Sequence, residues 1–547
     1  MAKINVFALG GQDENGKNSY VIEVDEKIFV IDAGTKSPIT SKLGVDTIIP
    51  SFEYIKKNIN KVQGIFITHG HDESFAALPW LLISIKGLTI YATEFTVAII
   101  KERISKYKIG HSDYKIVILK DSETFEGVKV KKIPLAHSIP GTIGLDFQTE
   151  DGSIVYLANY VLADLKAYGK TDLEEIKSKT SKKGILLLML ETSRASYVGY
   201  AADKVSVKPV IKKTFLETPD NKRIIVGAYD EEMFTLQQIL DLAIETGRPV
   251  VPYGRAYALL LEMYKKLHPE MKLPKIDDYK KIKSINNAVI LITGTGERLY
   301  QRFIRITEGN DVFLKFKSDD TVIMIAPPIN GLEKTAAKTL DLISRQLTRI
   351  YDVNEQDYYL ASPSKEDIIK TIEVLEPRNV LPIIGYYRYM DSAKRNMEKI
   401  MVKGRVQIQK NGMVMFWENG KLASTNGKIK EVGDTLIGGF GVGDLSYGVI
   451  AEKEELARDG VITVAIIMSY KTKKMIGMPH IKTTGIMIPK TDINYDDLIK
   501  SKIIQTVKEM KPRDYRIAQN RIRNRVKKAL FKTINKEPMV IVTFYEV

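Results

Sequence analysis

Short apolar runs bounded by Gly, Asn or Asp recur in the first part of the chain, and this pattern is typical of strands. Stretches with apolar residues at helical spacing, such as 75–84 and 94–107, lie between these runs. The alternation predicts a layered α/β domain over roughly the first 200 residues. The predicted strands are residues 4–9, 20–24, 28–31, 65–68, 154–157 and 185–190.

Two further regions follow. Alternating elements over residues 209–350 predict a separate lobe, with strands at 224–227, 288–293 and 321–326 and a helix at 231–246. Residues 437–448, which include GGFGVGD, are rich in glycine and poor in helix formers, so they predict a linker. A compact third unit comes after it, with a strand at 461–468, helices at 495–510 and 514–535, and the closing strand MVIVTFYEV.

Length and composition narrow the class of protein. The 547 residues exceed the usual size of a single hydrophobic core, so two or more domains are expected. Lys and Arg outnumber Asp and Glu by 82 to 67, and the net charge of +15 favours an anionic partner such as a nucleic acid. The chain has no cysteine, which excludes disulfides, thiolate-bound zinc and a cysteine nucleophile, and leaves His and carboxylate as metal ligands.

The start of the chain, MAKINVFALGGQDENGKNSY, becomes polar too early for a signal peptide. The longest apolar runs, such as 185–190, are far shorter than a bilayer crossing requires. We therefore expect a cytoplasmic protein that does not contact a membrane.

The stretch IFITHGHDES carries candidate chemistry. His69 and His71 follow an apolar strand, and a turn lets two imidazoles at this spacing converge on one cation such as zinc. The alternative is a solvated polar loop, because two histidines alone are modest support for a metal site.

Further motifs give this loop its context. They are ALGGQDENGKNSYVIE near the start, IDAG at 31–34, GVDTIIP at 44–50, THGHDES followed by ALPWLL, HSIPGTIG at 137–144, TGRPVVPYGR at 246–255, DTVIMIAPPINGLEK at 320–334 and the C-terminal NKEPMVIVTFYEV. Together these motifs resemble the ribonuclease J family nearly end to end. The resemblance implies a metallo-β-lactamase αββα sandwich with an inserted β-CASP α/β domain and a small α/β C-terminal domain.

The implied domain limits are as follows. The metallo-β-lactamase domain occupies 1–206 and 351–430 in two segments, and the β-CASP domain occupies 207–350 between them. A linker at 431–450 leads to the C-terminal domain at 451–547, which in the family chiefly supports assembly.

The family centre is a pair of zinc ions held by a His-x-His-x-Asp-His loop, a later His, a bridging Asp and a His near the end of the domain. His69, His71 and His137 match three of these imidazoles. The other positions depart from the family, with Glu73 for Asp, Ser74 for His, Asn159 for the bridging Asp and Ile384 for the last His. One metal site keeps three imidazoles, and the other keeps little more than Glu73.

These departures have a physical consequence. Two dications a few ångströms apart repel each other, and a bridging carboxylate or hydroxide makes the pair tolerable. An amide oxygen and a serine hydroxyl are poor zinc ligands, and isoleucine offers none. The remaining histidines, His111, His268 and His480, lie in contexts unlike any ligand segment. We expect at most one zinc ion, and a site that holds none is the alternative.

The segment that binds phosphate in the family, with the pattern His-x-Ser-Gly-His-x-Ser, aligns with residues 358–364. Tyr358 and Ser362 replace both of its histidines, which predicts a weaker grip on the terminal phosphate of an RNA. Arg255 and Ser364 match positions near the RNA channel of the family, so they are candidates for contact with the RNA backbone.

The predicted helix at 514–535 offers another RNA contact. Ile522, Val526, Ala529 and Leu530 fall on one stripe that we expect to be buried. Arg521, Arg525, Lys528 and Lys532 fall on another side, where RNA phosphates could neutralise them. A charge run of this kind is also typical of a solvated helix face.

Three functions remain open. Family activity is 5′-3′ exonuclease and endonuclease cleavage in mRNA decay and rRNA maturation, and this chain resembles the catalytically weak paralogue that binds RNA and an active ribonuclease J. It could instead be a slow one-zinc ribonuclease that uses His69, His71 and His137, with Glu73 as catalytic base. Or it could be a non-catalytic RNA-binding scaffold. The resemblance also implies a homo- or hetero-oligomer, either a dimer or a tetramer.

Overall fold

The computed structural model describes residues 2–38, 45–329, 331–347, 349–401, 404–438, 441–442, 447–486, 494–510 and 514–547. The chain divides into two compact units, one of residues 1–39 and 47–435 and one of residues 40–46 and 436–547. Both are built from helices and strands, so the predicted α/β class is confirmed. Most of the GGFGVGD stretch that was predicted to be a linker lies outside the described residues.

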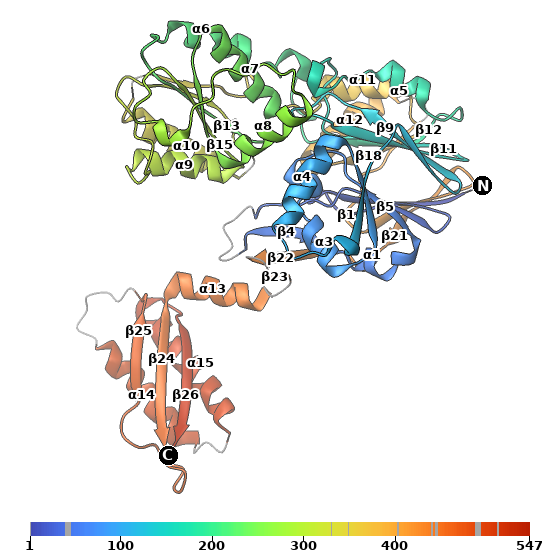
Figure 1. The fold of residues 1–547 in the computed structure, drawn as a ribbon. Helices are drawn as coiled ribbons and strands as arrows, with labels where there is room; N and C mark the ends of the chain where they lie inside the picture. Colours follow the sequence, from blue (N-terminus) through green and yellow to red (C-terminus); the bar gives the residue numbers. More distant parts are fainter. Residues whose placement is uncertain are drawn as a thin grey trace. The chain divides into compact units, whose positions relative to one another are not determined.

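The first sheet of the larger unit has eight strands in the order β21-β20-β1-β2-β3-β5-β6-β7. The strands from β3 to β7 are parallel and the others antiparallel. Their bounds are β1 Lys3–Gly10, β2 Ser19–Val24, β3 Lys27–Ile31, β5 Val62–Phe66, β6 Leu88–Ala92, β7 Tyr114–Ile118, β20 Met413–Glu418 and β21 Lys421–Lys428. The helices nearby in sequence are α1 Glu53–Lys57, α2 Asp72–Phe75, α3 Leu78–Ser84 and α4 Glu94–Ser105 (Figure 1).

The second sheet has seven strands in the order β19-β18-β12-β11-β10-β9-β8. Strands β11, β12, β18 and β19 run parallel. The bounds are β8 Ser122–Phe125, β9 Val128–Pro134, β10 Ile143–Thr149, β11 Gly152–Leu157, β12 Ile185–Glu191, β18 Asn379–Ile383 and β19 Arg405–Val406. Helices α5 (Leu173–Lys179), α11 (Lys365–Leu375) and α12 (Tyr387–Ile400) lie beside this sheet (Figure 1).

Apolar side chains from the two sheets form one shared core. Phe29 of β3 and Phe66 of β5 both contact Phe147 of β10, with ring centroids 5.5 and 5.8 Å apart. Such edge-on aromatic contacts add to the stability gained from burying the rings. The two sheets and their outer helices therefore form the predicted αββα sandwich.

The predicted bounds of one helix in this sandwich were wrong. The sequence pattern indicated a continuous helix over 75–84, but α2 ends at Phe75 and α3 begins at Leu78. Pro79 at the start of α3 has no backbone N–H to donate to the preceding turn, and the N–H of Ala77 donates to Ala33 O instead.

The inserted lobe has a five-stranded parallel sheet in the order β14-β15-β13-β16-β17. Both of its faces are covered, so the central strand β13 is buried along its whole length. Even-numbered residues of β13 pack with α6, α7 and α8, and Ile225 packs with α9 and α10. The bounds are α6 Lys208–Glu217, β13 Ile224–Tyr229, α7 Met233–Glu245, β14 Val250–Tyr253, α8 Arg255–Leu267, β15 Val289–Gly294, α9 Glu297–Thr307, β16 Thr321–Ile325, α10 Glu333–Ser344 and β17 Arg349–Asp352.

The chain leaves the sandwich and returns to it at adjacent points. Arg194 and Ser364 form a parallel bridge, and Lys365 N donates to Tyr197 O over 3.0 Å. Gly199 N donates to the carboxylate of Glu366 over 2.7 Å. The two ends of the inserted lobe are thus held together by hydrogen bonds from main-chain N–H groups to a carbonyl oxygen and a carboxylate.

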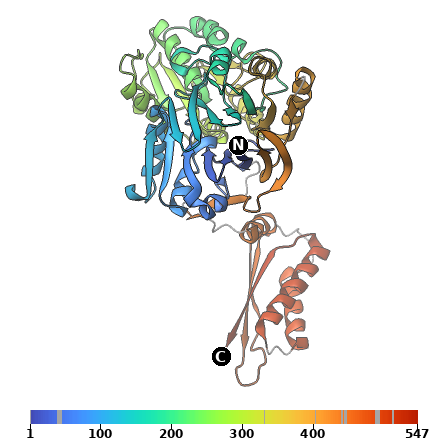
Figure 2. The same ribbon diagram turned by 90° about the vertical axis from the view of Figure 1, so that its right-hand side faces the viewer.

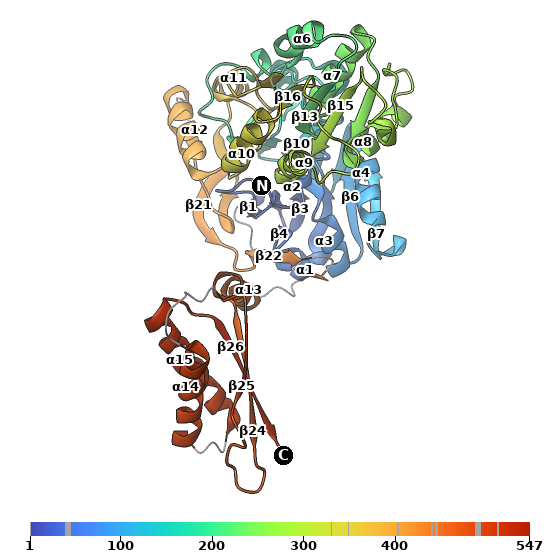
Figure 3. The same cartoon turned by 90° about the vertical axis from the view of Figure 1, so that its left-hand side faces the viewer.

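The smaller unit contains a sheet in the order β25-β24-β26, with β24 and β26 parallel. Helices α14 and α15 lie on the same face of it (Figures 2 and 3). The bounds are α13 Tyr447–Asp459, β24 Val461–Met468, β25 His480–Thr484, α14 Tyr495–Met510, α15 Tyr515–Ile534 and β26 Met539–Glu546. Short strands β4 (Thr47–Pro50), β22 (Asp434–Gly438) and β23 (Gly441–Val442) complete the described strands.

Helix α15 shows how local chemistry sets its length. The Asp514 carboxylate accepts a hydrogen bond from Arg516 N at the start, and Asn535 takes a left-handed conformation at the end. Ile522, Val526 and Leu530 are buried as predicted, but Ala529 is half-buried and its place on the stripe is taken by Ala518. None of the helices in the described part of the chain has the length and apolar character that a bilayer crossing requires.

Candidate metal centre

The candidate site lies at one edge of the sandwich, where several strands end. His69 and His71 follow β5, and His137 lies in the loop between β9 and β10. Asn159 and Ile384 follow β11 and β18, which flank β12 in register. Because these strands run parallel, segments far apart in the sequence meet at this edge.

Three imidazoles form a compact buried cluster. The ring centroids of His69, His71 and His137 are 4.8 to 5.2 Å apart, and each ring offers one nitrogen within 4.8 Å of the others. All three side chains are almost fully buried. The spacing is short enough for one small cation to be bound by all three.

Hydrogen bonds indicate which ring nitrogen of His69 and of His137 carries no proton. His69 Nδ1 lies 2.9 Å from the Thr68 hydroxyl, which donates onward to the Asp32 carboxylate, and His137 Nδ1 lies 2.7 Å from Ala361 O. A proton on each Nδ1 satisfies these contacts and leaves Nε2 as a lone pair. Both Nε2 atoms are buried and make no hydrogen bond with any described residue, and His69 Nε2 lies 3.7 Å from a carboxylate oxygen of Glu73. Orphaned acceptors of this kind fit a bound metal ion.

The third ring, that of His71, has different partners at its two nitrogens. His71 Nε2 lies 3.2 Å from Glu231 O, so it carries the proton, and Nδ1 faces Glu73 at 3.3 Å. Burial tends to lower the pKa of His71, but the carboxylate of Glu73 raises it to about 10. Burial also raises the pKa of Glu73, yet His71 and His69 bring it well below its usual range. These two residues form an ion pair when no metal is bound.

The other two rings are neutral. Burial lowers the pKa of His69 to about 4, and it lowers the pKa of His137 well below its ordinary value with help from the neighbouring His71. Neutral imidazole is the form that binds a metal ion.

Two of the positions that lack ligands have an unusual backbone. Asn159 and Ile384 have φ angles of 55° and 54°, in the left-handed region. Asparagine tolerates that region, but a β-branched side chain does so at a cost of roughly 1–2 kcal/mol. Ile384 is buried, and Ser74 is buried beside Asp32. Of these three side chains, none is an imidazole or a carboxylate.

A second group of potential metal ligands was not predicted from the sequence. His71, Glu73 and Glu231 each offer one ligand atom, and these atoms lie within 4.8 Å of one another. Glu231 lies in the turn between β13 and α7 of the inserted lobe, within the acidic triplet Asp230 to Glu232. That triplet after an apolar strand was the available signal. Burial and the neighbouring Asp72 raise the pKa of Glu231 well above its usual range.

The segment that aligns with the family's phosphate-binding pattern is closed off here. The Tyr358 side chain is buried, and its hydroxyl contacts Thr235 at 2.7 Å and Glu232 at 3.4 Å. Ser364 caps α11, with its hydroxyl bound to Gly199 O and the Asp367 carboxylate. This hydroxyl is buried and engaged within the protein, and the contact of Ser364 with RNA stays a prediction.

The other candidate RNA residues differ in exposure. Arg255 is exposed at the start of α8. On α15, Arg521 and Lys528 are exposed, whereas Arg525 is half-buried and pairs with Glu509 at 2.5 Å. Arg525 is thus already neutralised within the protein.

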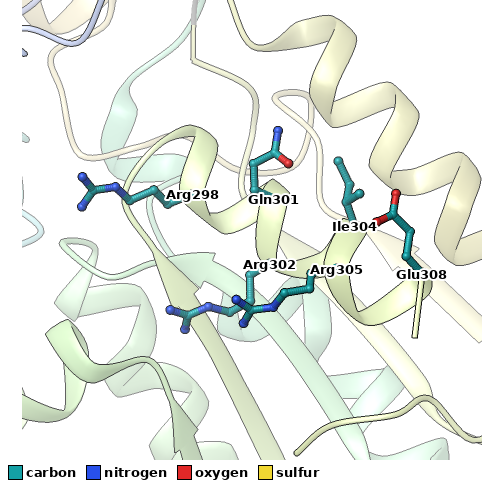
Figure 4. A pocket seen from close by; sticks show the side chains of 6 residues that line it. All are labelled: Arg298, Gln301, Arg302, Ile304, Arg305 and Glu308. Carbon is teal, nitrogen blue, oxygen red and sulfur yellow. The ribbon is translucent and has the colours of Figure 1, made fainter. Parts of the chain in front are cut away.

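A basic pocket on α9 was also missed. It has a volume of about 460 Å³ and is lined by Arg298, Gln301, Arg302, Ile304, Arg305 and Glu308 (Figure 4). Arg302 donates to Tyr253 O and Thr293 O, and Arg305 pairs with Asp311. Arg298 is exposed, and its side chain makes no hydrogen bond or ion pair with a described residue. The arginines recur at helical spacing in ERLYQRFIRIT, which was the available signal.

Comparison with known proteins gives matches along most of the chain. Residues 13–157 match the metallo-beta-lactamase superfamily, residues 221–343 the beta-CASP domain of ribonuclease J, and residues 448–547 the ribonuclease J C-terminal domain. The chain is 28% identical to Ribonuclease J2 of Bacillus subtilis (strain 168), over 100% of this chain and 99% of that protein. It is 24% identical to Ribonuclease J 2 of Staphylococcus aureus (strain NCTC 8325 / PS 47), over 100% and 98%.

A solved structure shares the fold. A protein of unknown function from Enterococcus faecalis V583 superposes with a TM-score of 0.54 and 16% sequence identity. The match covers 76% of this chain and 100% of that chain. At this identity the likeness concerns the fold alone.

Proposed function

This chain belongs to the ribonuclease J family, and on that premise we propose that it is an RNA-binding subunit with little or no nuclease activity of its own, assembled with an active ribonuclease J paralogue. Its family resemblance, inferred from the sequence motifs, is confirmed by these matches. The proposal extends to mRNA decay and rRNA maturation as its processes. It also assigns the lactamase domain to 1–206 and 351–430, the β-CASP domain to 207–350, a linker to 431–450 and the C-terminal domain to 451–547.

The observation that carries the proposal is the uneven donor set at the strand ends. Three imidazoles are brought together, but Ser74, Asn159 and Ile384 supply neither an imidazole nor a carboxylate. Without an anionic bridge, the repulsion between two adjacent dications is not offset. Two-metal hydrolysis of a phosphodiester is therefore disfavoured at this site.

RNA binding is supported by exposed cations. The net charge is +15, and Arg255 and Arg298 are exposed on helices of the inserted lobe. Arg521 and Lys528 are exposed on α15. Phosphate contacts from such residues release counterions, so they contribute affinity that falls as salt rises.

A second function is favoured by one specific observation. The Nε2 atoms of His69 and His137 make no hydrogen bond with a described residue and fit a single zinc ion, with His71 as the third ligand. Bound there, zinc would polarise a phosphoryl oxygen or lower the pKa of a water molecule. Thr68 and Asp32 orient His69, and Glu73 offers a carboxylate that can accept a proton. These residues would make a slow one-metal ribonuclease.

Degradation of a 5′-monophosphorylated RNA by the purified chain, with its binding measured in parallel, separates the two functions. The variant His71→Ala is compared with His111→Ala, which alters an exposed histidine. Binding without cleavage in all three proteins is the result expected of a weak or inactive subunit. Cleavage that His71→Ala loses and His111→Ala keeps would instead establish the one-metal ribonuclease.

The assembly is tested separately. The chain is purified together with a ribonuclease J paralogue that carries an intact His-x-His-x-Asp-His loop, and the complex is sized by light scattering. A mixed oligomer is expected. If the chain binds RNA but forms no complex with the paralogue, the non-catalytic scaffold replaces the partner subunit as the function.

A further inference from the structure

Glu231 is an unexplained carboxylate of the inserted lobe that lies next to His71 of the sandwich. It lies in the turn before α7, and its backbone oxygen is 3.2 Å from His71 Nε2. Its carboxylate makes no hydrogen bond or ion pair with any described residue. A half-buried charged carboxylate without such a partner costs free energy unless it takes up a proton or a cation compensates it.

The surroundings of Glu231 add negative charge. Asp72, Glu73 and Asp230 all act on it electrostatically and disfavour its charged form. Arg103 pairs with Asp72. His71 favours the charged form of Glu231 but is paired with Glu73, and among the described residues no salt bridge reaches the Glu231 carboxylate. A divalent cation would offset the repulsion among these carboxylates.

The donor atoms are already grouped. One atom each from His71, Glu73 and Glu231 lies within 4.8 Å of the other two. The adjoining Nε2 atoms of His69 and His137 are buried without hydrogen-bond partners, which independently indicates that a ligand binds next to this set. One ring nitrogen of His71 carries a proton, so this ring serves one ion, and both donor sets describe the surroundings of the same ion.

We propose that Glu231 of the inserted lobe is a ligand of a divalent cation held by His71 and Glu73, and that it replaces a carboxylate ligand missing from the sandwich. Imidazole and carboxylate together suit ions that accept both nitrogen and oxygen, such as Mn²⁺. The ion joins the loop after β5 to the turn before α7, so it links the sandwich to the inserted lobe. This inference does not depend on RNA binding or on a partner subunit.

The test measures Mn²⁺ binding to the full chain after metal removal, by electron paramagnetic resonance of free Mn²⁺. Glu231→Gln keeps the size of the side chain and removes its charge. It is expected to weaken Mn²⁺ binding at least about tenfold, and Glu73→Gln is expected to do the same. Mn²⁺ is also expected to raise the melting temperature of the wild type more than that of Glu231→Gln, because the ion stabilises the state that binds it.

The matched control is Glu297→Gln, the same change in the first turn of α9 in the same lobe. Its Mn²⁺ affinity is expected to equal that of the wild type. The inference is wrong if Glu231→Gln binds Mn²⁺ as tightly as the wild type does. It is also wrong if Mn²⁺ binding is lost in His137→Ala but unchanged in Glu231→Gln. If the wild type binds RNA but no Mn²⁺, the inference fails and the proposed RNA-binding function stands.

Discussion

The candidate metal centre has two halves that differ in both side chains and backbone. In the imidazole half, His69 and His137 are held by Thr68 and by Ala361 O, and their free nitrogens are buried. In the other half, Asn159 and Ile384 keep left-handed backbone conformations at two strand ends but offer no strong metal ligand. A left-handed backbone at a strand end therefore does not by itself supply a metal ligand. Metal binding depends on side chains together with the hydrogen bonds that orient them.

Removing an imidazole should have the largest effect. His69→Ala deletes one of the three grouped rings, and we expect divalent-metal affinity to fall more than about 100-fold, beyond what loss of an orienting partner costs. Isothermal titration calorimetry with Zn²⁺ measures this change, with His111→Ala as the control. An unchanged affinity would remove the distinction between the two halves.

The hydrogen bond behind His69 should matter nearly as much. Thr68→Val keeps the shape of the side chain and removes the hydroxyl that links His69 Nδ1 to Asp32. Loss of such an orienting partner typically weakens metal binding by about 10- to 100-fold. The same titration is used, with Thr47→Val as a control on a strand outside this hydrogen-bond chain. A Thr68→Val affinity equal to that of the wild type would show that ring orientation is set by packing alone.

Restoring the missing metal ligands is the reverse experiment. The triple variant Ser74→His, Asn159→Asp, Ile384→His restores an anionic bridge and two imidazoles, and histidine tolerates the left-handed backbone at 384 better than isoleucine. We expect a second bound ion and a rise of about tenfold in cleavage of 5′-monophosphorylated RNA. Metal content by mass spectrometry and an RNA decay assay measure both. Asn159→Asp alone should give neither gain, and a triple variant that still holds one ion would show that the backbone has changed too.

The smallest effect concerns strain at Ile384. Ile384 and its neighbour Ile383 are both buried, but Ile384 alone of the two has a positive φ, of 54°. Replacement by glycine costs apolar burial at both sites and relieves left-handed strain at 384. We expect Ile384→Gly to destabilise the protein by about 1 kcal/mol less than Ile383→Gly, as measured by urea unfolding. Equal losses would mean that the left-handed backbone at 384 carries no strain.

The fold could be predicted wherever local chemistry decides it. Helix α15 matches its predicted limits because Asp514 and Asn535 supply caps that the sequence displays. The prediction of one helix over 75–84 was wrong because the apolar residues keep a helical spacing on both sides of Pro79, although a new helix begins at Leu78. Ala529 was placed on the buried stripe by periodicity, but the tertiary packing of α15 buries Ala518 instead.

The site could be predicted in the same uneven way. His69 and His71 are two residues apart, so their spacing is visible in the sequence, and His137 came from the family resemblance. Glu231 lies 160 residues beyond His71, and only the packing of the inserted lobe brings it near. Similarly, the pairing of Arg525 with Glu509 joins two helices, which a charge count along one helix cannot show.

The adjacent exit and return of the inserted lobe have a consequence for its history. Because Arg194 and Ser364 lie side by side, the lobe behaves topologically as one long loop of the sandwich. A few residues would suffice to join those two points if the lobe were removed, since chain ends that meet at a surface tolerate insertion and deletion. A single genetic event could thus add, exchange or delete the whole lobe without rerouting any strand of the sandwich.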